Sequence, residues 1–267
     1  AGLFPQACVE MSDDMREALQ AGVKREEAGL ARNTILRILD NAEEAQQQQI
    51  PTCQDTGLVV VFTEVGQDLH IEGTTLQEAI NAGVRMGHQE GFLRASIAAD
   101  PIRRGNTGDN TPAVVHTELV EGDRLKLQLL AKGGGAENMS RFRMLKPADG
   151  REGVIDFVLE TAVLAGPNAC PPLVVGVGIG GSFDYAPILA KRALLRRVGQ
   201  PNPQPHIAEM ERELLEKINA SGIGPQGYGG QTTALAVQIE PRPCHLAALP
   251  VSVNLECHAH RHREAIL

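Results

Sequence analysis

Three cysteines lie far apart along this chain, each in a loop-like sequence, and a fold that uses them together must bring three distant loops to one place. The loops are Pro51–Gly57 around Cys53, Gly166–Pro172 around Cys170, and Asn254–Arg261 around Cys257. Each cysteine has Gly, Pro or His nearby, where the backbone can bend around an inorganic centre. In the first loop, Cys53 places a soft metal ligand two residues before the carboxylate of Asp55, as metal-assisted acid–base chemistry requires.

The spacing of the cysteines leaves a second interpretation open. The chain contains no C-x-x-C pair, which excludes the usual zinc-finger and ferredoxin patterns. A lone cysteine is more often a small buried hydrophobe than a ligand, and we expect that role for Cys8 and Cys244. Five scattered cysteines in 267 residues do not form a disulfide framework, so we expect a reducing, cytoplasmic compartment.

Charge and hydropathy limit the classes of partner. The net charge of −8 argues against nucleic acid as the main partner, although local arginines can still bind an anionic substrate. No apolar run approaches the ~20 residues that span a bilayer. The first ten residues lack the basic start and apolar stretch of a signal peptide. We therefore expect neither nucleic acid nor a membrane as partner.

Periodic patterns predict both helices and strands. One predicted helix begins after an N-cap at Ser12 and another begins at Thr75. Further predicted helices cover Arg32–Gln48, Val154–Leu164, Pro187–Val198 and Ile207–Asn219. Predicted strands cover Leu58–Val65, Leu173–Ile179, Thr232–Ile239 and Leu249–Val253. Val114–Val120 and Arg124–Leu130 flank Glu121-Gly122-Asp123, which is typical of a β-hairpin.

Because these elements do not alternate strictly, we expect a mixed α+β fold with helices packed on mixed sheets. We treat residues 1–267 as one catalytic region, with two lobes, 1–198 and 206–267, around a shared site. The proline-rich segment 199–205 is the best candidate for a linker between them.

Two glycine-rich stretches resemble phosphate-binding motifs but lack their context. Gly176–Gly181 contains G-x-G-x-x-G between a strand and a helix, yet no acidic residue lies about 20 residues further on. We expect these glycines to allow a close backbone approach instead. Lys132–Asn138 lacks the second half of a P-loop. Two interpretations remain: a flexible loop at the end of a strand, or a nest of backbone N–H groups that faces a carboxylate.

Several polar residues have an ordinary structural interpretation beside a functional one. His245 is by default a hydrogen-bonded polar side chain, and Arg94 a surface charge. An arginine does suit a dicarboxylate, because its guanidinium binds carboxylates bidentately. The histidines that follow Cys257 could form a surface metal chelator or a solvated basic end.

Taken together, the motifs resemble the alpha region of the iron–sulfur-dependent hydro-lyases, the family of class I fumarate hydratases and L-tartrate dehydratases. The resemblance rests on five stretches in the family's order: Cys53–Gly57, Lys132–Asn138, Asn168–Pro172, Gly224–Gly227 and Cys257–Arg261. They cover nearly the whole chain. Chance agreement at five separate motifs is improbable.

The resemblance implies a [4Fe–4S] cluster held by Cys53, Cys170 and Cys257, with one iron left open to act as a Lewis acid. Cys244 is a competing third ligand, but the surroundings of Cys257 match the family better. The resemblance also implies a substrate site of Gln54, Asp55, Arg94, Gly134 and His245, with Asp55 and His245 as catalytic residues. Asp55 would serve as an acid or hydrogen-bond partner near the leaving hydroxyl.

The resemblance further implies an alpha subunit that is inactive until a beta subunit completes its site, in a higher oligomer. Its glycine loop, with Lys132 and Glu137-Asn138, is closer to the fumarase form. Reversible hydration of fumarate to L-malate is therefore the favoured reaction. The alternative within the family is an L-tartrate dehydratase alpha subunit or a related dicarboxylate dehydratase. An alternative from another class is a non-catalytic metal-binding subunit.

Overall fold

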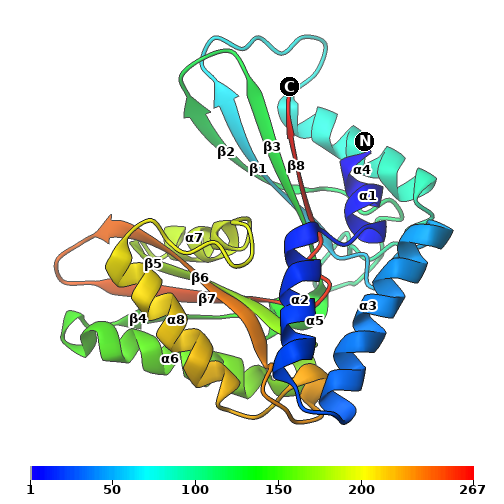
Figure 1. Ribbon diagram of the computed structural model, residues 1–267. Helices are drawn as coiled ribbons and strands as arrows, with labels where there is room; N and C mark the ends of the chain where they lie inside the picture. Colours follow the sequence, from blue (N-terminus) through cyan, green and yellow to red (C-terminus); the bar gives the residue numbers. More distant parts are fainter. Residues whose placement is uncertain (1) are drawn as a thin grey trace. The chain divides into compact units, whose positions relative to one another are not determined.

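Two four-stranded mixed sheets organise the chain, so the α+β prediction is confirmed. The structure, a computed structural model, describes residues 2–267 (Figure 1). The first unit comprises Ala1–Ser12, Asn41–Gly134 and Ala259–Leu267, and the second comprises Asp13–Asp40 and Gly135–His258. The expected division at 199–205 does not coincide with this one, because that segment lies inside the second unit. Within residues 2–267, no helix combines the length and apolarity needed to cross a membrane.

The sheet of the first unit has the strand order β2-β1-β3-β8. Its strands are β1 (Leu58–Gly66), β2 (Val114–Val120), β3 (Leu125–Lys132) and β8 (His262–Ile266). The predicted hairpin of β2 and β3 is wrong, because β1 lies between them, parallel to β2 and antiparallel to β3. The connecting turn passes around the end of β1, where the Asp68 N–H donates to the Gly122 carbonyl at 2.9 Å. The valine-rich β1 is far more buried than β2, which explains its central place.

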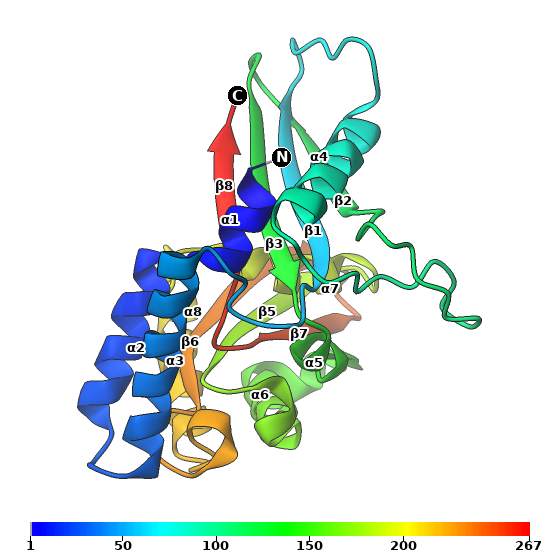
Figure 2. The same cartoon turned by 90° about the vertical axis from the view of Figure 1, so that its right-hand side faces the viewer.

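Helices α1 (Leu3–Val9) and α4 (Leu76–Glu90) pack with the sheet of the first unit (Figure 2). Their buried side chains share one apolar cluster with those of β1 and β3, including Phe4, Val61, Val84 and Leu129. The predicted start of α4 is confirmed, since the Thr75 hydroxyl accepts from the Glu78 N–H at 3.2 Å.

The sheet of the second unit has the order β4-β7-β5-β6. Its strands are β4 (Arg141–Leu145), β5 (Leu173–Gly181), β6 (Ala234–Cys244) and β7 (Leu249–Glu256). Its helices include α2 (Asp13–Arg25), α6 (Gly150–Ala165), α7 (Tyr185–Ala193) and α8 (Pro205–Asn219). The remaining helices are α3 (Leu30–Gln48), α5 (Gly134–Asn138) and the 3₁₀ turns Pro147–Asp149, Gly166–Ala169 and Pro225–Gly227. The predicted Ser12 cap is wrong, because the Ser12 hydroxyl has no hydrogen-bond partner in the described part of the chain.

The glycines of β5 make room for α7, as the sequence predicts. A Cβ on Gly176 would lie 2.1 Å from the Ala190 carbonyl oxygen, and one on Gly178 equally close to that of Ala186. Alternate residues of a strand face opposite sides of its sheet. Val175 and Val177 accordingly belong to the apolar core that α6 and α8 share. These glycines therefore serve helix packing.

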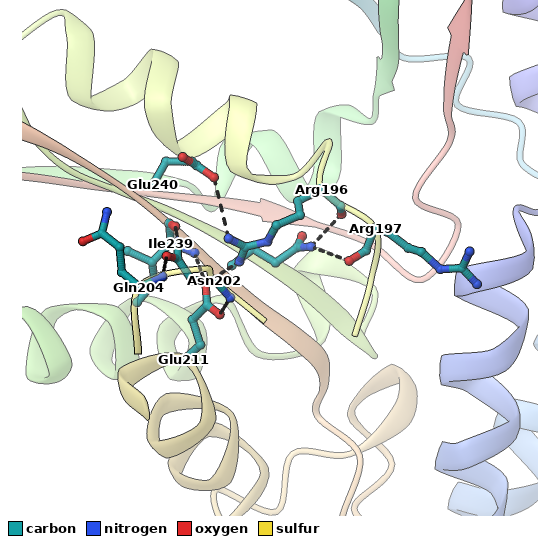
Figure 3. A network of polar contacts seen from close by, with 8 residues as sticks. Arg196, Arg197, Asn202, Gln204, Glu211, Ile239 and Glu240 are labelled. Atoms are coloured by element: carbon teal, nitrogen blue, oxygen red, sulfur yellow. Dashed lines mark hydrogen bonds and ion pairs between the residues drawn. The ribbon is translucent and has the colours of Figure 1, made fainter. Parts of the chain in front are cut away.

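A buried carboxylate fixes segment 199–205 inside the second unit (Figure 3). Glu211, on α8, accepts from the backbone N–H groups of Asn202 at 2.9 Å and Ile239 at 2.8 Å, and pairs with Arg196. The Asn202 side chain donates to the Ile239 carbonyl at 2.8 Å. These bonds tie the segment to α8 and to β6.

Candidate active site

The carboxylate of Asp55 joins two predicted motifs in the first unit. Its Oδ2 accepts from the Gly134 N–H at 2.7 Å, and its Oδ1 accepts from the Gly57 N–H at 3.0 Å. Gly57 has φ +80°, and a Cβ there would lie 2.6 Å from the Lys132 carbonyl oxygen. A side chain at position 57 would therefore separate the loop after Cys53 from the glycine loop.

Arg261 is a buried cation in the same place, and the sequence interpretation did not single it out. Its guanidinium donates to the Asp55 carbonyl oxygen and hydrogen-bonds the Cys8 thiol. Its own carbonyl accepts from the Ala131 N–H at 2.9 Å. The side chain is 4% exposed. Arg261 thus links the C-terminal motif to the loop after Cys53. Its place in the Cys257–Arg261 motif was the only feature of the sequence that could have indicated this role.

Cys8 is buried, as predicted, and lies close to the Cys53 loop. Burial raises the pKa of the Cys8 thiol, and the charge of Arg261 and its hydrogen bond oppose that rise. The Cys8 carbonyl accepts from both the N–H and the hydroxyl of Thr52, at 2.9 and 3.1 Å. The half-buried Cys53 sulfur accepts from the Asp55 N–H at 3.5 Å and lies 3.4 Å from the Gln54 Oε1. The loop around Cys53 is therefore held on both sides.

Backbone contacts place Arg94 beside the same loop. Its carbonyl accepts from the Thr56 hydroxyl at 2.7 Å and from the Asn110 side-chain amide at 3.0 Å. Its side chain is exposed. Asn110, fully buried and at φ +61°, also accepts from the Ser96 N–H at 2.7 Å. A lone asparagine in a loop gave no sequence signal for this supporting role.

Three further motifs converge in the second unit around Cys170. Cys170 adopts the left-handed conformation (φ 54°, ψ 64°), which is uncommon for a residue with a side chain. Its carbonyl accepts from the N–H of His258, the residue after Cys257, at 3.2 Å. Gln226 donates to the Pro171 carbonyl through both its backbone N–H, at 2.9 Å, and its side-chain amide, at 2.7 Å. The same amide nitrogen lies 3.0 Å from the His258 Nδ1.

His245 lies away from this group. It occupies the exposed turn between β6 and β7, where its Nδ1 accepts from the Ala247 N–H at 3.1 Å. β7 begins just after this turn and ends at Glu256, next to Cys257. At about 3.3 Å per strand residue, roughly 25 Å separates the two ends. The structure thus brings Cys170 and Cys257 together but leaves His245 at the far end of β7.

Cys244 is exposed, so its predicted burial is wrong. β6 ends at Cys244, where the strand enters the turn, and the Cys244 sulfur donates to the Ala248 carbonyl at 3.3 Å. The neighbouring Leu246 is 96% exposed. The sulfur is exposed because β6 has already left the core before the turn, and its last three residues, Arg242–Cys244, are all exposed.

The three predicted metal ligands are half-buried thiols, and no disulfide engages them within the described residues. Cys53 belongs to the first unit, whereas Cys170 and Cys257 belong to the second. Among residues 2–267, no three His, Cys, Asp or Glu side chains are grouped closely enough to hold one metal ion. As a donor set, three thiols in bent loops suit an iron–sulfur centre, and the hydrogen bonds join the loops of two of them.

Comparisons with known proteins place this arrangement among hydro-lyases. The profile of a family described as fumarate hydratase (Fumerase) matches residues 1–266. A Methanocaldococcus jannaschii protein, provisionally named L(+)-tartrate dehydratase subunit alpha, is 42% identical over 97% of this chain and 93% of its own length. The L(+)-tartrate dehydratase alpha subunit of Escherichia coli K12 is 34% identical over 94% of this chain and 84% of its own.

Proposed function

Because the chain belongs to the fumarate hydratase family of hydro-lyases, we propose that it is the alpha subunit of an L(+)-tartrate dehydratase. The observation that carries this choice is the similarity, over nearly the full length of both chains, to proteins with that name. Fumarate hydration, favoured by the sequence interpretation, is the second candidate.

The contacts of Glu137 weaken the sequence argument for fumarate. The Glu137 carboxylate pairs with Lys191 and accepts from the Asn254 side chain at 2.9 Å. These bonds hold α5 to α7 and β7. Glu137 therefore has a structural role, and its resemblance to the fumarase loop carries little information about the substrate.

Cys53, Cys170 and Cys257 would hold the [4Fe–4S] cluster in this proposal. When bound, the cluster supplies a Lewis acid for the departing substrate hydroxyl. The hydrogen bonds of His258 and Gln226 set the backbone of Cys170 and Pro171, and those of Thr52 and Asp55 hold the chain on both sides of Cys53.

Asp55 is the proposed acid–base residue, with Gln54 and Arg94 beside it as substrate-binding groups. The N–H groups of Gly57 and Gly134 fix the orientation of its carboxylate. If a substrate carboxylate takes the Gly134 N–H, it displaces the Asp55 Oδ2 and frees that oxygen for proton transfer. Arg94, with its exposed side chain and anchored backbone, suits a bidentate clamp on the same carboxylate.

His245 can serve such a site only from another copy of the chain, since β7 separates it from Cys257 in its own unit. This proposal fits the expected higher oligomer and the exposure of its turn. A beta subunit, which the names of the relatives suggest, would supply the remaining substrate contacts.

The test is an anaerobic assay of the reconstituted chain, with and without a beta subunit, on L(+)-tartrate and on fumarate. We expect turnover only with both chains and a higher kcat/KM for tartrate. A higher value for fumarate would select the second candidate. Full turnover by the isolated chain would contradict the subunit proposal. A colourless protein without iron or sulfide would favour the non-catalytic metal-binding alternative.

A further inference from the structure

A cavity lies in the second unit, and its lining includes no residue from the loops of Cys170 and Cys257. It has a volume of about 460 Å³, in the range of small-molecule sites. The end of α2, the last turns of α8 and a residue three positions before β6 form its walls: Arg25, Arg212, Leu215, Glu216, Asn219, Ala220 and Gln231. None of these residues belongs to the proposed active site.

Two arginines in this cavity have no ion pair or hydrogen bond from their side chains to any described residue. They are Arg25 and Arg212. The acidic neighbour of Arg212 on α8, Glu213, is already paired with Arg151 and Lys217. The acidic neighbour of Arg25, Glu26, follows the end of α2 and accepts from the Gln231 N–H through both oxygens, at 2.8 and 3.0 Å. In a chain of net charge −8, two such unpaired guanidinium groups in one cavity attract an anion.

Two other polar residues of the cavity, Glu216 and Asn219, add one acceptor and one fixed donor. Glu216 contributes the acceptor, so the two arginines outnumber the carboxylates. Asn219 uses its Oδ1 to accept from the N–H groups of Thr233 and Ala234, both at 2.8 Å. These bonds fix its amide group and leave the amide nitrogen as its donor. Leu215 and Ala220 give the cavity an apolar wall for the remainder of a ligand.

We propose that this cavity binds a small organic oxyanion, a phosphate ester or a carboxylate, through Arg25, Arg212 and the amide of Asn219. A guanidinium donates two parallel hydrogen bonds to either anion, which makes the contact directional as well as charged. Glu216 accepts from a hydroxyl of the same ligand. Leu215 and Ala220 contact its carbon skeleton.

Hydrogen bonds connect the wall of this cavity to the Cys170 loop. Thr233, whose N–H is held by Asn219, accepts from the Gly224 N–H through its hydroxyl at 3.0 Å. Gly224 precedes Gln226, which donates to the Pro171 carbonyl next to Cys170. A ligand that immobilises Asn219 therefore also slows opening of segment 224–231.

Calorimetric titration of the assembled enzyme with inorganic phosphate and with malonate tests the site and distinguishes the two ligand sources. We expect saturable binding of at least one anion, weakened about 10-fold or more by Arg25→Gln or Arg212→Gln, the scale of one lost charge-assisted hydrogen bond. Lys24→Gln, next to Arg25 but outside the cavity, is the matched control and should bind as the wild type does.

Hydrogen exchange supplies a second measurement, in which we expect the bound anion to protect the amides of segment 224–231. No saturable binding of either anion, or equal binding by wild type and Arg212→Gln, would overturn the proposal. The titration measures binding and not turnover, so its result tests the anion site independently of the proposed activity.

Discussion

The backbone N–H of Gly134 donates to the carboxylate of Asp55 at 2.7 Å, although 79 positions separate these residues in the sequence. This bond joins the loop after Cys53 to the glycine loop. A second N–H, from Gly57, binds the other carboxylate oxygen. The Gly57 bond keeps the proposed proton-transfer group oriented when a substrate carboxylate takes the Gly134 N–H, which lowers the cost of reaching the reactive geometry.

We predict that Asp55→Asn lowers kcat about 10²-fold or more, the usual effect of a lost acid–base group, while iron and sulfide contents stay unchanged. An amide cannot exchange a proton as a carboxyl group can, but it nearly preserves the size of the side chain. The measurement is steady-state turnover of the variant paired with its beta subunit. An unchanged kcat would remove Asp55 from the mechanism.

Cysteine variants separate the two candidates for the third cluster ligand. We predict that Cys257→Ser and Cys170→Ser lose bound iron and the visible absorption of the cluster, whereas Cys244→Ser keeps both. Cys244 is exposed in the turn after β6, while Cys257 adjoins the residue that bonds to Cys170. Iron and sulfide counts with an EPR spectrum decide the question. If only Cys244→Ser lost the cluster, Cys244 would be the third ligand and Cys257 would not.

For His245, the proposed role in another copy's site predicts complementation between copies. His245→Asn should raise KM for the dicarboxylate and leave the cluster intact. When His245→Asn chains are mixed with Asp55→Asn chains, activity should partly return, because some sites then combine an intact Asp55 with an intact His245 of another copy. If no activity returns although mixed oligomers form, His245 does not act between copies.

The sequence predicted most individual elements but not how they pair. Runs of β-branched residues located β1 and β5, and the apolar stripe that follows Thr75 located α4. The place of β1 between β2 and β3 depends on long-range pairing, which a local turn pattern does not encode. Likewise, the last strand returns to pair with β3, so the first unit combines both ends of the chain.

Sequence motifs predicted the candidate site, and hydrogen bonds in the structure added the residues that support it. Asp55, Gly134 and the motifs around Cys170 and Cys257 are joined by hydrogen bonds in the structure. Asn110 and the bonds of Gln226 could not be predicted, because a single buried amide has no periodic pattern. The far position of His245 follows from the length of β7, which became clear only once the strand's direction was known.

A glycine substitution tests the contact between the loops. We predict that Gly57→Ala destabilises the chain by about 3 kcal/mol or more, since alanine is strained at φ +80° and its Cβ would meet the Lys132 carbonyl oxygen at 2.6 Å. Gly105→Ala is the control, because a Cβ there meets nothing within 4 Å. Urea unfolding of both variants gives the comparison. Equal unfolding midpoints for Gly57→Ala and Gly105→Ala would show that the close contact between the two loops does not stabilise the fold.

Acid should weaken the loop that carries Asn110 through its neighbour Asp109. Hydrogen bonds from the hydroxyl and N–H of Thr111 hold the pKa of Asp109 below its ordinary value. A carboxyl group whose folded pKa is lowered adds stability above its unfolded pKa, and this contribution is lost as the pH falls through the folded pKa. Asp109→Asn should therefore be less stable than wild type at neutral pH and lose less stability below about pH 4. Unfolding midpoints across that range, with the exposed Asp68→Asn as control, measure the difference. Parallel pH profiles for wild type and Asp109→Asn would show that these hydrogen bonds contribute nothing to folding.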